Sequence, residues 1–224
     1  MKKALLLIAA AAMLGGCSAN AAEKNAKTEK MEEQEVKKAE ESPVHNQATE
    51  YVPSSQIVDD AQLLQVGQSI ANDKGIATVK AIKQVEQTVQ IGAVDLVIHD
   101  VKIIDYTPSY GMIDFFHGYT HDEQFHFVKL NVEVQNTSSK KVKFAPIAVL
   151  ETSTGEQKHW DDDIYLENIN GELAPSQGKR GNLGFILEGK QPESIKWIKV
   201  TTSDLVDEEH KVVEGAKEIR IDME

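Results

Sequence analysis

Three histidines in one short stretch come closest to forming a chemical site in this sequence. His117, His121 and His126 lie near one another along the chain, with Asp122 and Glu123 between them. Imidazole nitrogens bind zinc and copper, so three of them could form a tetrahedral or related metal site. Their spacing matches no standard zinc motif. His126 also has the parity of an apolar strand face, so the alternative to a metal ligand is a histidine buried in the core. A zinc- or copper-binding surface protein is therefore one hypothesis.

A second polar cluster follows Trp160. Asp161, Asp162 and Asp163, with Glu167 nearby, carry the carboxylate oxygens that calcium prefers. Calcium needs roughly six to eight oxygens in a shaped loop, and this spacing matches no EF-hand loop. We interpret the cluster as a solvated acidic turn.

The sequence contains no recognised catalytic motif. It has no Gly-x-Ser-x-Gly elbow, no phosphate-binding loop and no His-Glu-x-x-His pattern. Acidic residues are plentiful, but no pair of them stands out for acid-base chemistry. We predict that the protein is not an enzyme and that it needs no cofactor.

The clearest covalent chemistry is lipid attachment at Cys17, the one cysteine of the sequence. Lys2 and Lys3 precede an apolar run, residues 4–14, which is shorter than the roughly 20 residues that span a bilayer. Such a run is typical of a signal peptide. It leads into Leu14-Gly15-Gly16-Cys17, which resembles a bacterial lipobox, in which the cysteine receives a diacylglyceryl group and begins the mature protein. The alternative is an ordinary secretory signal with an incidental cysteine.

Lipid on Cys17 would fix where the protein works. Each buried methylene contributes about 0.8 kcal/mol, and stable attachment takes two acyl chains, which a diacylglyceryl cysteine carries. We expect residues 1–16 to be a lipoprotein signal peptide. The mature protein would then be anchored to the outer side of the cell membrane by palmitate-type chains. With its cysteine used in this way, the domain has no disulfide and depends on core burial for stability.

Composition divides the rest of the chain. Residues 17–55 are rich in Glu, Lys, Ala, Asn and Gln and have too few apolar residues to offset chain entropy, which predicts a disordered, lipid-anchored tether. Residues 56–66 have mixed periodicity and form either a short helix or an irregular lead-in. Residues 67–224 are long enough for one core of their own.

The strand expected over residues 125–136 organises this domain. Val128, Leu130 and Val132 alternate with polar residues, so the strand has one apolar face and one wet face. Turn formers follow it, and the apolar run 142–150 then predicts a hairpin partner.

Further strands are expected along the whole domain. Within residues 94–106 the apolar parity changes near His99 and Asp100, which predicts a β-bulge there. Other short strands are expected over residues 76–82, 88–91, 181–187, 194–202, 211–213 and 217–223. Regular turn signals and no strong helix predict an all-β, antiparallel β-sandwich.

The connection over residues 107–124 is unusually long and apolar. Exposed, it would form a patch that contacts a partner. Folded over the open end of the sandwich, it would instead bury its rings as a lid. The candidate contact residues are Tyr110, Met112, Phe115, Phe116 and Tyr119.

The chain resembles a family of bacterial surface lipoproteins with an immunoglobulin-like domain of unknown function. This family is related in fold to a secreted mycobacterial immunoprotective antigen. The resemblance is carried by the strand 127–138, the strand closing in residues 151–155, Leu173-Ala174-Pro175 with Gly178, and Gly184-Phe185. The family usually has Gly directly after that Pro, whereas Ser176 and Gln177 intervene here. The resemblance implies an immunoglobulin-like sandwich and says nothing of a ligand.

Charge limits the class of partner. The formal net charge is −12, and an acidic domain does not neutralise phosphates, so we expect no nucleic-acid binding, although some family members carry a telomere-repeat-binding label. The partners we predict are the membrane, through Cys17, and a protein or another component of the cell envelope.

Overall fold

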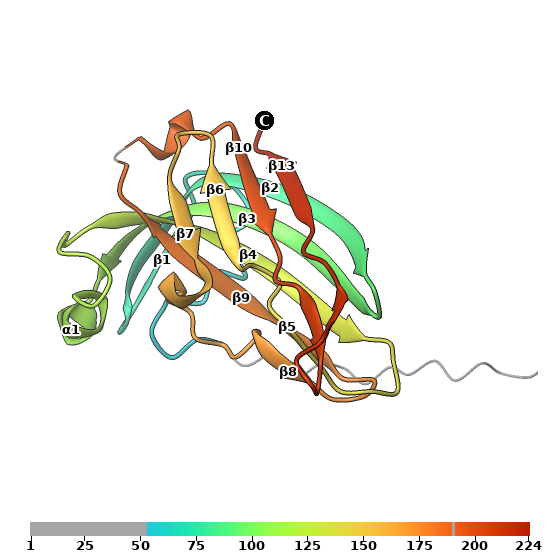
Figure 1. Cartoon of the computed structure of the whole chain (residues 1–224). Helices are drawn as coiled ribbons and strands as arrows, with labels where there is room; N and C mark the ends of the chain where they lie inside the picture. The colour runs from blue at the N-terminus through green and yellow to red at the C-terminus, as the bar shows by residue number, and fades with distance from the viewer. Residues whose placement is uncertain (1–52, 190) are drawn as a thin grey trace, which may run out of the picture. The chain divides into compact units, whose positions relative to one another are not determined.

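The computed structural model describes residues 53–189 and 191–224 (Figure 1). The predicted signal peptide, Cys17 and nearly all of the predicted tether lie outside the described residues.

One long antiparallel sheet, here called the main sheet, runs through the described chain (Figure 1). Its strand order is β1-β2-β3-β4-β9, so β4 is an interior strand between β3 and β9. The strands are β1 (Ser69–Asn72), β2 (Gly75–Ile91), β3 (Val94–Pro108), β4 (Phe125–Asn136) and β9 (Gly178–Leu187).

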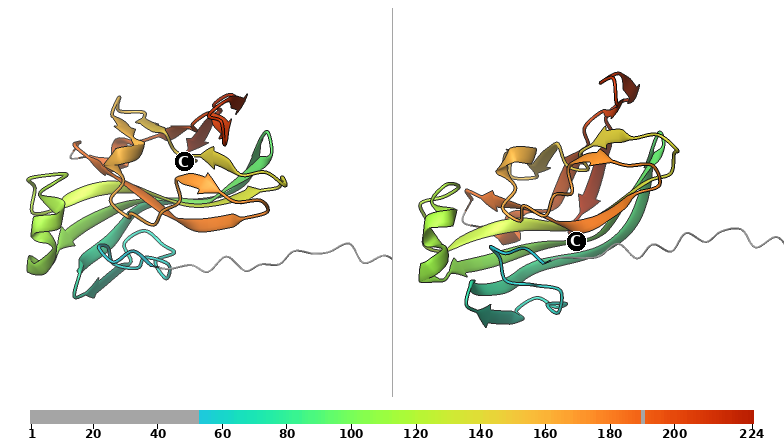
Figure 2. Two further views of the ribbon diagram at one scale, coloured as in Figure 1. Left: turned by 60° about the horizontal axis from the view of Figure 1, so that its bottom comes forward. Right: turned by 90° about the horizontal axis from the view of Figure 1, so that it is seen from below.

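Two four-stranded sheets pack together on the inner face of the main sheet (Figure 2). One has the order β13-β10-β6-β7 and the other β12-β11-β5-β8. Their strands are β5 (Val142–Phe144), β6 (Val149–Thr152), β7 (Gln157–His159), β8 (Gly171–Leu173), β10 (Trp197–Thr201), β11 (Leu205–Asp207), β12 (Val212–Glu214) and β13 (Glu218–Asp222). The antiparallel sandwich predicted from the sequence is confirmed; its immunoglobulin-like assignment stays a prediction.

The outer face of the main sheet is also partly covered. Residues 53–68, here called the lead-in segment, run irregularly across it and bury Ile57, Val58 and Leu63 against β2, β3 and β4. The short helix α1 (Ile113–Phe116) covers the end of the same face (Figure 2). The remaining helical turns are η1 (Tyr110–Met112), η2 (Trp160–Asp162) and η3 (Pro192–Ser194). The fold therefore has two apolar clusters, one on each face of the main sheet.

Strand β4 confirms the predicted span and corrects the predicted environment. Val128 and Leu130 are fully buried on the inner face, as expected. The face expected to be wet is largely covered as well, since Lys129 is 3% exposed and Asn131 is 8% exposed. Asp60 of the lead-in segment covers Lys129, whereas Arg180 and Asn182 on β9 contact Asn131. These contacts join segments far apart in sequence, so the strand's own pattern does not predict them.

The β-bulge predicted near His99 is confirmed. Ile98 pairs with Val132 and Asp100 pairs with Asn131, so His99 is the extra residue in β3. Ile98 and Val101 are three positions apart, so a regular strand would point them to opposite faces. The bulge lets both enter the core.

The predicted hairpin between residues 125–136 and 142–150 is wrong. Strand β4 pairs with β3 and β9, whereas β5 belongs to another sheet. Where the chain leaves β4, the Asn136 Nδ2 donates to the carbonyl oxygens of Lys140 at 2.7 Å and Ala174 at 2.9 Å, which stabilises the turn. The run 142–150 is itself divided into β5 and β6 around Pro146, which has no N–H for a sheet ladder.

The two strands predicted over residues 76–82 and 88–91 form one continuous strand, β2. Two register shifts interrupt its pairing with β3, between Val79 and Ala81 and between Gln84 and Gln87. Glu86, inside the second shift, has a φ of 45°. These irregularities interrupt the alternation of apolar and polar residues from which a strand is recognised in a sequence.

Candidate functional site

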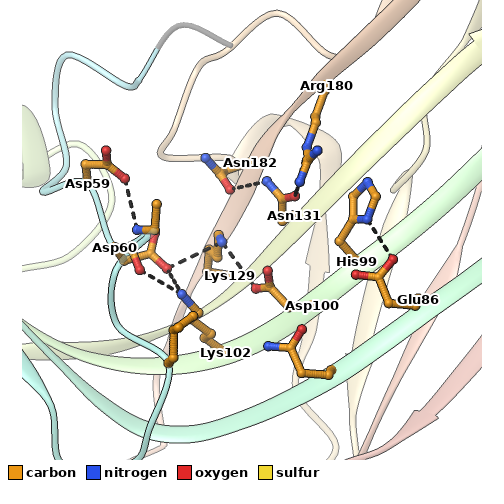
Figure 3. A pocket seen from close by; sticks show the side chains of 13 residues that line it. Asp59, Asp60, Glu86, His99, Asp100, Lys102, Lys129, Asn131, Arg180 and Asn182 are labelled. Carbon is orange, nitrogen blue, oxygen red and sulfur yellow. Dashed lines mark hydrogen bonds and ion pairs between the residues drawn. The ribbon is translucent and has the colours of Figure 1, made fainter. Parts of the chain in front are cut away.

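A polar pocket of about 380 Å³ lies on the outer face of the main sheet, beside the lead-in segment (Figure 3). Strands β2, β3, β4 and β9 form its floor and the lead-in segment forms one wall. Its lining is almost entirely charged or amide side chains, and no Phe, Tyr or Trp is among them. The residues are Asp59, Asp60, Ala61, Leu64, Gln84, Glu86, His99, Asp100, Lys102, Lys129, Asn131, Arg180 and Asn182.

Four charges form a buried network at the wall of this pocket. The Lys102 Nζ lies 2.6 Å from the Asp60 Oδ2, and these two side chains are only 2% and 3% exposed. The Lys129 Nζ lies 3.4 Å from the same oxygen and 3.2 Å from the Asp100 Oδ1. Two ammonium groups and two carboxylates balance one another, as buried charges require. Asp60 thus fastens the lead-in segment to β3 and β4 (Figure 3).

The electrostatics favour ionised Asp60. Burial by itself would raise the pKa of this carboxyl, but Lys129 and Lys102 together outweigh that effect and hold the pKa below its ordinary value of 3.8. The Tyr165 hydroxyl adds a hydrogen bond to the Asp60 Oδ1 at 3.3 Å.

A chain of hydrogen bonds orients Arg180 toward the middle of the pocket. The Asn131 Oδ1 accepts from the Arg180 Nε at 3.3 Å and from its Nη2 at 3.2 Å. The Asn131 Nδ2 donates to the Asn182 Oδ1 at 2.9 Å, and the Asn182 Nδ2 donates to both carboxylate oxygens of Glu167. Glu167 also accepts from the backbone N–H groups of Asn182 and Ser54, so the chain ends on backbone. The guanidinium is therefore held in a fixed direction although it is partly in solvent.

The opposite side of the pocket is acidic. The bulge residue His99 lies between two carboxylates, with its Nδ1 3.0 Å from the Glu86 Oε2 and its Nε2 3.4 Å from the Glu133 Oε2. Asp100 lies beside it on β3. Figure 3 shows Glu86 and His99 on the side of the pocket away from Asp59 and Asp60. The pocket thus presents a cation from β9 and carboxylates from β2 and β3, an arrangement that binds polar groups of both signs.

No motif in the sequence predicts this pocket. Lys102 lies within Val101-Lys102-Ile103-Ile104, and a charge inside an apolar strand run is a signal that a partner is buried with it. Nothing in the sequence identifies Asp60 as that partner, because the two residues are separated by 42 positions.

The three predicted histidine ligands are not brought together as a metal site. The His117 and His121 rings lie 6.3 Å apart between centroids. The His126 Nε2 instead lies 3.7 Å from the Asp105 Oδ1 across the β3–β4 ladder. In the described part of the chain, no group of three or more His, Cys, Asp or Glu side chains has an arrangement that could hold a metal ion.

The long connection after β3 folds over the end of the main sheet. Phe116 is 2% exposed and packs against Tyr106 and Phe125, with ring centroids 5.5 Å and 5.1 Å apart. Phe115, Met112 and Tyr119 are partly buried around it. Tyr110 is 94% exposed. Among the predicted contact residues, Phe116 is therefore unavailable to a partner, whereas Tyr110 is free to make contact.

The acidic cluster after Trp160 is not a solvated turn throughout. Asp163 is buried, and its carboxylate accepts from the backbone N–H groups of Gly184, Tyr165 and Leu166. Burial raises the pKa of Asp163, although these hydrogen bonds oppose the rise. Asp163 therefore fixes the chain after η2 against β9, and the sequence prediction was wrong for this residue.

Comparison with known proteins places the chain in a family. Residues 83–204 match the family described as Domain of unknown function (DUF4352). The chain belongs to the DUF4352 family. This match includes strands β3, β4 and β9, which form most of the pocket floor, but not the lead-in segment that forms its wall.

Two proteins of Bacillus subtilis (strain 168) are similar to this DUF4352 chain along most of their length. "Uncharacterized protein YdhF" is 44% identical, with 99% of each protein covered. "SPbeta prophage-derived uncharacterized lipoprotein YonS" is 24% identical over 71% of this chain and 72% of that protein. A functionally unknown protein from Listeria monocytogenes EGD-e has a similar solved structure, with a TM-score of 0.51 at 12% identity, covering 66% of this chain and 88% of that one. The last likeness concerns the fold alone.

No helix in the described residues is long and apolar enough to cross a membrane.

Proposed function

We propose that this DUF4352 protein is a lipid-anchored extracytoplasmic protein that presents its β-sandwich as a binding or structural module. The observation that carries the proposal is the sequence Leu14-Gly15-Gly16-Cys17 after a basic N-terminus and an apolar run. Two acyl chains on Cys17 would suffice for stable membrane attachment. One relative, YonS, is named as a lipoprotein, which supports the same assignment.

A binding module fits the described geometry better than an enzyme does. The pocket holds its charges in paired, hydrogen-bonded networks, and none of its residues forms a nucleophile–base pair with an orienting third group. A protein or cell-envelope partner remains our prediction for the exposed Tyr110 at the end of the molecule. The metal-binding alternative has no observation in its favour.

The anchor is tested by substituting Cys17 with Ala and growing bacteria with a clickable palmitate analogue. We expect label on the unmodified protein and on a Ser18→Ala control, and no label on Cys17→Ala. We also expect only the labelled proteins to enter the detergent phase on phase separation. An unmodified protein without label, or a labelled Cys17→Ala variant, would contradict the proposal.

A further inference from the structure

We propose that the polar pocket on the outer face of the main sheet binds a free α-amino acid, a small zwitterion whose carboxylate contacts Arg180 and whose ammonium contacts Asp100. This goes beyond lipid anchoring, which concerns only where the protein is held. The inference rests on three features of the pocket: unused hydrogen-bonding groups of opposite sign, their separation, and the rigidity of the groups that hold them.

The first feature is unused hydrogen-bonding capacity. Arg180 donates hydrogen bonds from its Nε and Nη2 to the Asn131 Oδ1, and its Nη1 has no hydrogen-bond partner among residues 53–189 and 191–224. The Asp100 carboxylate contacts Lys129 through Oδ1, and its Oδ2 has no partner within the same residues. A guanidinium N–H suits a carboxylate ligand and a carboxylate oxygen suits an ammonium ligand.

The second feature is the distance between these groups. Asn131 on β4 lies directly opposite Asp100 on β3 and directly opposite Asn182 on β9. The Arg180 guanidinium reaches from β9 to the Asn131 Oδ1 at 3.2 Å, so it lies over β4. Strand β4 is one spacing, about 5 Å, from β3, which carries Asp100. A ligand with its two charges on neighbouring groups, each hydrogen-bonded at about 3 Å, spans this gap over Asn131.

The third feature is preorganisation. The hydrogen bonds from Arg180 through Asn131 and Asn182 to Glu167 fix the direction of the guanidinium before a ligand arrives. Lys129 fixes the Asp100 carboxylate in the same way. Fixed polar groups lose little conformational entropy on binding, so even a small ligand is held.

The lining also narrows the ligand class. The pocket has no Phe, Tyr or Trp side chain on which a sugar ring could stack, and Glu86 and Asp59 add carboxylates that repel ligands of net negative charge. A cavity of about 380 Å³ is near the lower end for small-molecule sites, which suits an amino acid better than a nucleotide.

The test is calorimetric titration of the full chain in mild detergent with each standard L-α-amino acid. We expect at least one to bind. We expect its N-acetyl derivative, which lacks the ammonium, and its amide, which lacks the carboxylate, to bind at least about tenfold more weakly, because each has lost a charge-assisted hydrogen bond.

Variants assign the binding to this pocket. Arg180→Gln and Asp100→Asn should each weaken binding by about tenfold or more. The sequence contains one other arginine, Arg220, which lies on β13 beside Asp222, so Arg220→Gln is the matched control and should bind as the unmodified chain does. Arg180 is exposed, so its variant should keep the fold, which circular dichroism verifies.

Three results would overturn the proposal: no heat with any amino acid, equal binding of the blocked derivatives, or unchanged binding by a folded Arg180→Gln variant. None of these results depends on Cys17. Failure of the pocket proposal is therefore distinguishable from failure of the lipid anchor, which is read out by palmitate labelling.

Discussion

Lys102 and Lys129 are long cationic side chains that the fold removes almost completely from water. Each is 3% exposed or less. Asp60 is the closest carboxylate to Lys102, at 2.6 Å, and the second closest to Lys129, at 3.4 Å. Removing one partner from such a network leaves a buried charge without compensation, which costs more than the pair itself contributes.

The first prediction concerns Lys102→Met. We expect the free energy of unfolding to fall by about 3 kcal/mol, because the variant leaves Asp60 with only the more distant Lys129. Lys80→Met is the control, since the Lys80 Nζ also pairs with a carboxylate, Asp105 at 3.3 Å, but its side chain is 41% exposed. That substitution should cost less than about 1 kcal/mol. Urea unfolding of both variants measures the difference; equal losses would contradict a buried network.

The second prediction concerns pH. The folded-state pKa of Asp60 is lowered, so the unfolded chain binds a proton at this site more readily. The stability that Asp60 contributes is therefore complete above pH 3.8 and is lost as the pH falls through the lower folded value. Burial raises the pKa values of Asp163 and Glu167, so protonation of those two groups acts in the opposite direction.

Asp60→Asn should therefore be less stable than the unmodified chain at neutral pH and should lose less further stability on acidification to about pH 3. Urea midpoints measured across this range give the two slopes. Asp59→Asn, at the exposed neighbouring position, should keep the steeper slope. Parallel curves for the unmodified chain and Asp60→Asn would show that the ion pairs do not form.

At the scale of elements, the lead-in segment is the part of the fold that creates the site. It has no regular structure, yet it supplies Asp60 to the ion network and Ile57, Val58 and Leu63 to the outer apolar cluster. Its position at the start of the described chain places it next to the predicted tether. Docking of this segment therefore fixes the start of the described chain on the main sheet.

The third prediction tests this docking. Ile57→Ala should lower the free energy of unfolding by about 2–4 kcal/mol, since Ile57 is 1% exposed and its truncation leaves a cavity against the main sheet. Leu64→Ala, seven positions along the same segment, should change it by less than about 0.5 kcal/mol because Leu64 is 62% exposed. Similar values for both would mean that the segment is not docked.

Particular elements show what the sequence could and could not predict. Strand β4 and the bulge at His99 were predicted correctly because strict alternation and a single change of parity are local signals. The partner of β4 was predicted wrongly because turn composition indicates that the chain turns but not which sheet it enters next, and the contacts of Asn136 with Lys140 and Ala174 in that turn leave no signal in the sequence.

At the scale of the whole molecule, the main sheet is apolar on both faces over part of its length. The inner face packs against the two smaller sheets, and the outer face packs against the lead-in segment and α1. The pocket lies beside the lead-in segment, where this outer cover stops (Figure 3). The sequence predicts the sandwich class, but a site assembled from four strands and a distant irregular segment leaves no local motif.

Covalent labelling of lysines tests the outer cover most directly. The full chain, in its native state, is treated with an acetylating reagent, and the modified lysines are located by mass spectrometry. We predict that Lys102 and Lys129 stay unmodified while Lys80 reacts readily, because the Lys80 side chain is 41% exposed and those of Lys102 and Lys129 are 2% and 4% exposed. Modification of Lys102 and Lys129 at the rate of Lys80 would mean that the lead-in segment does not cover the main sheet, and the pocket would then lose its wall.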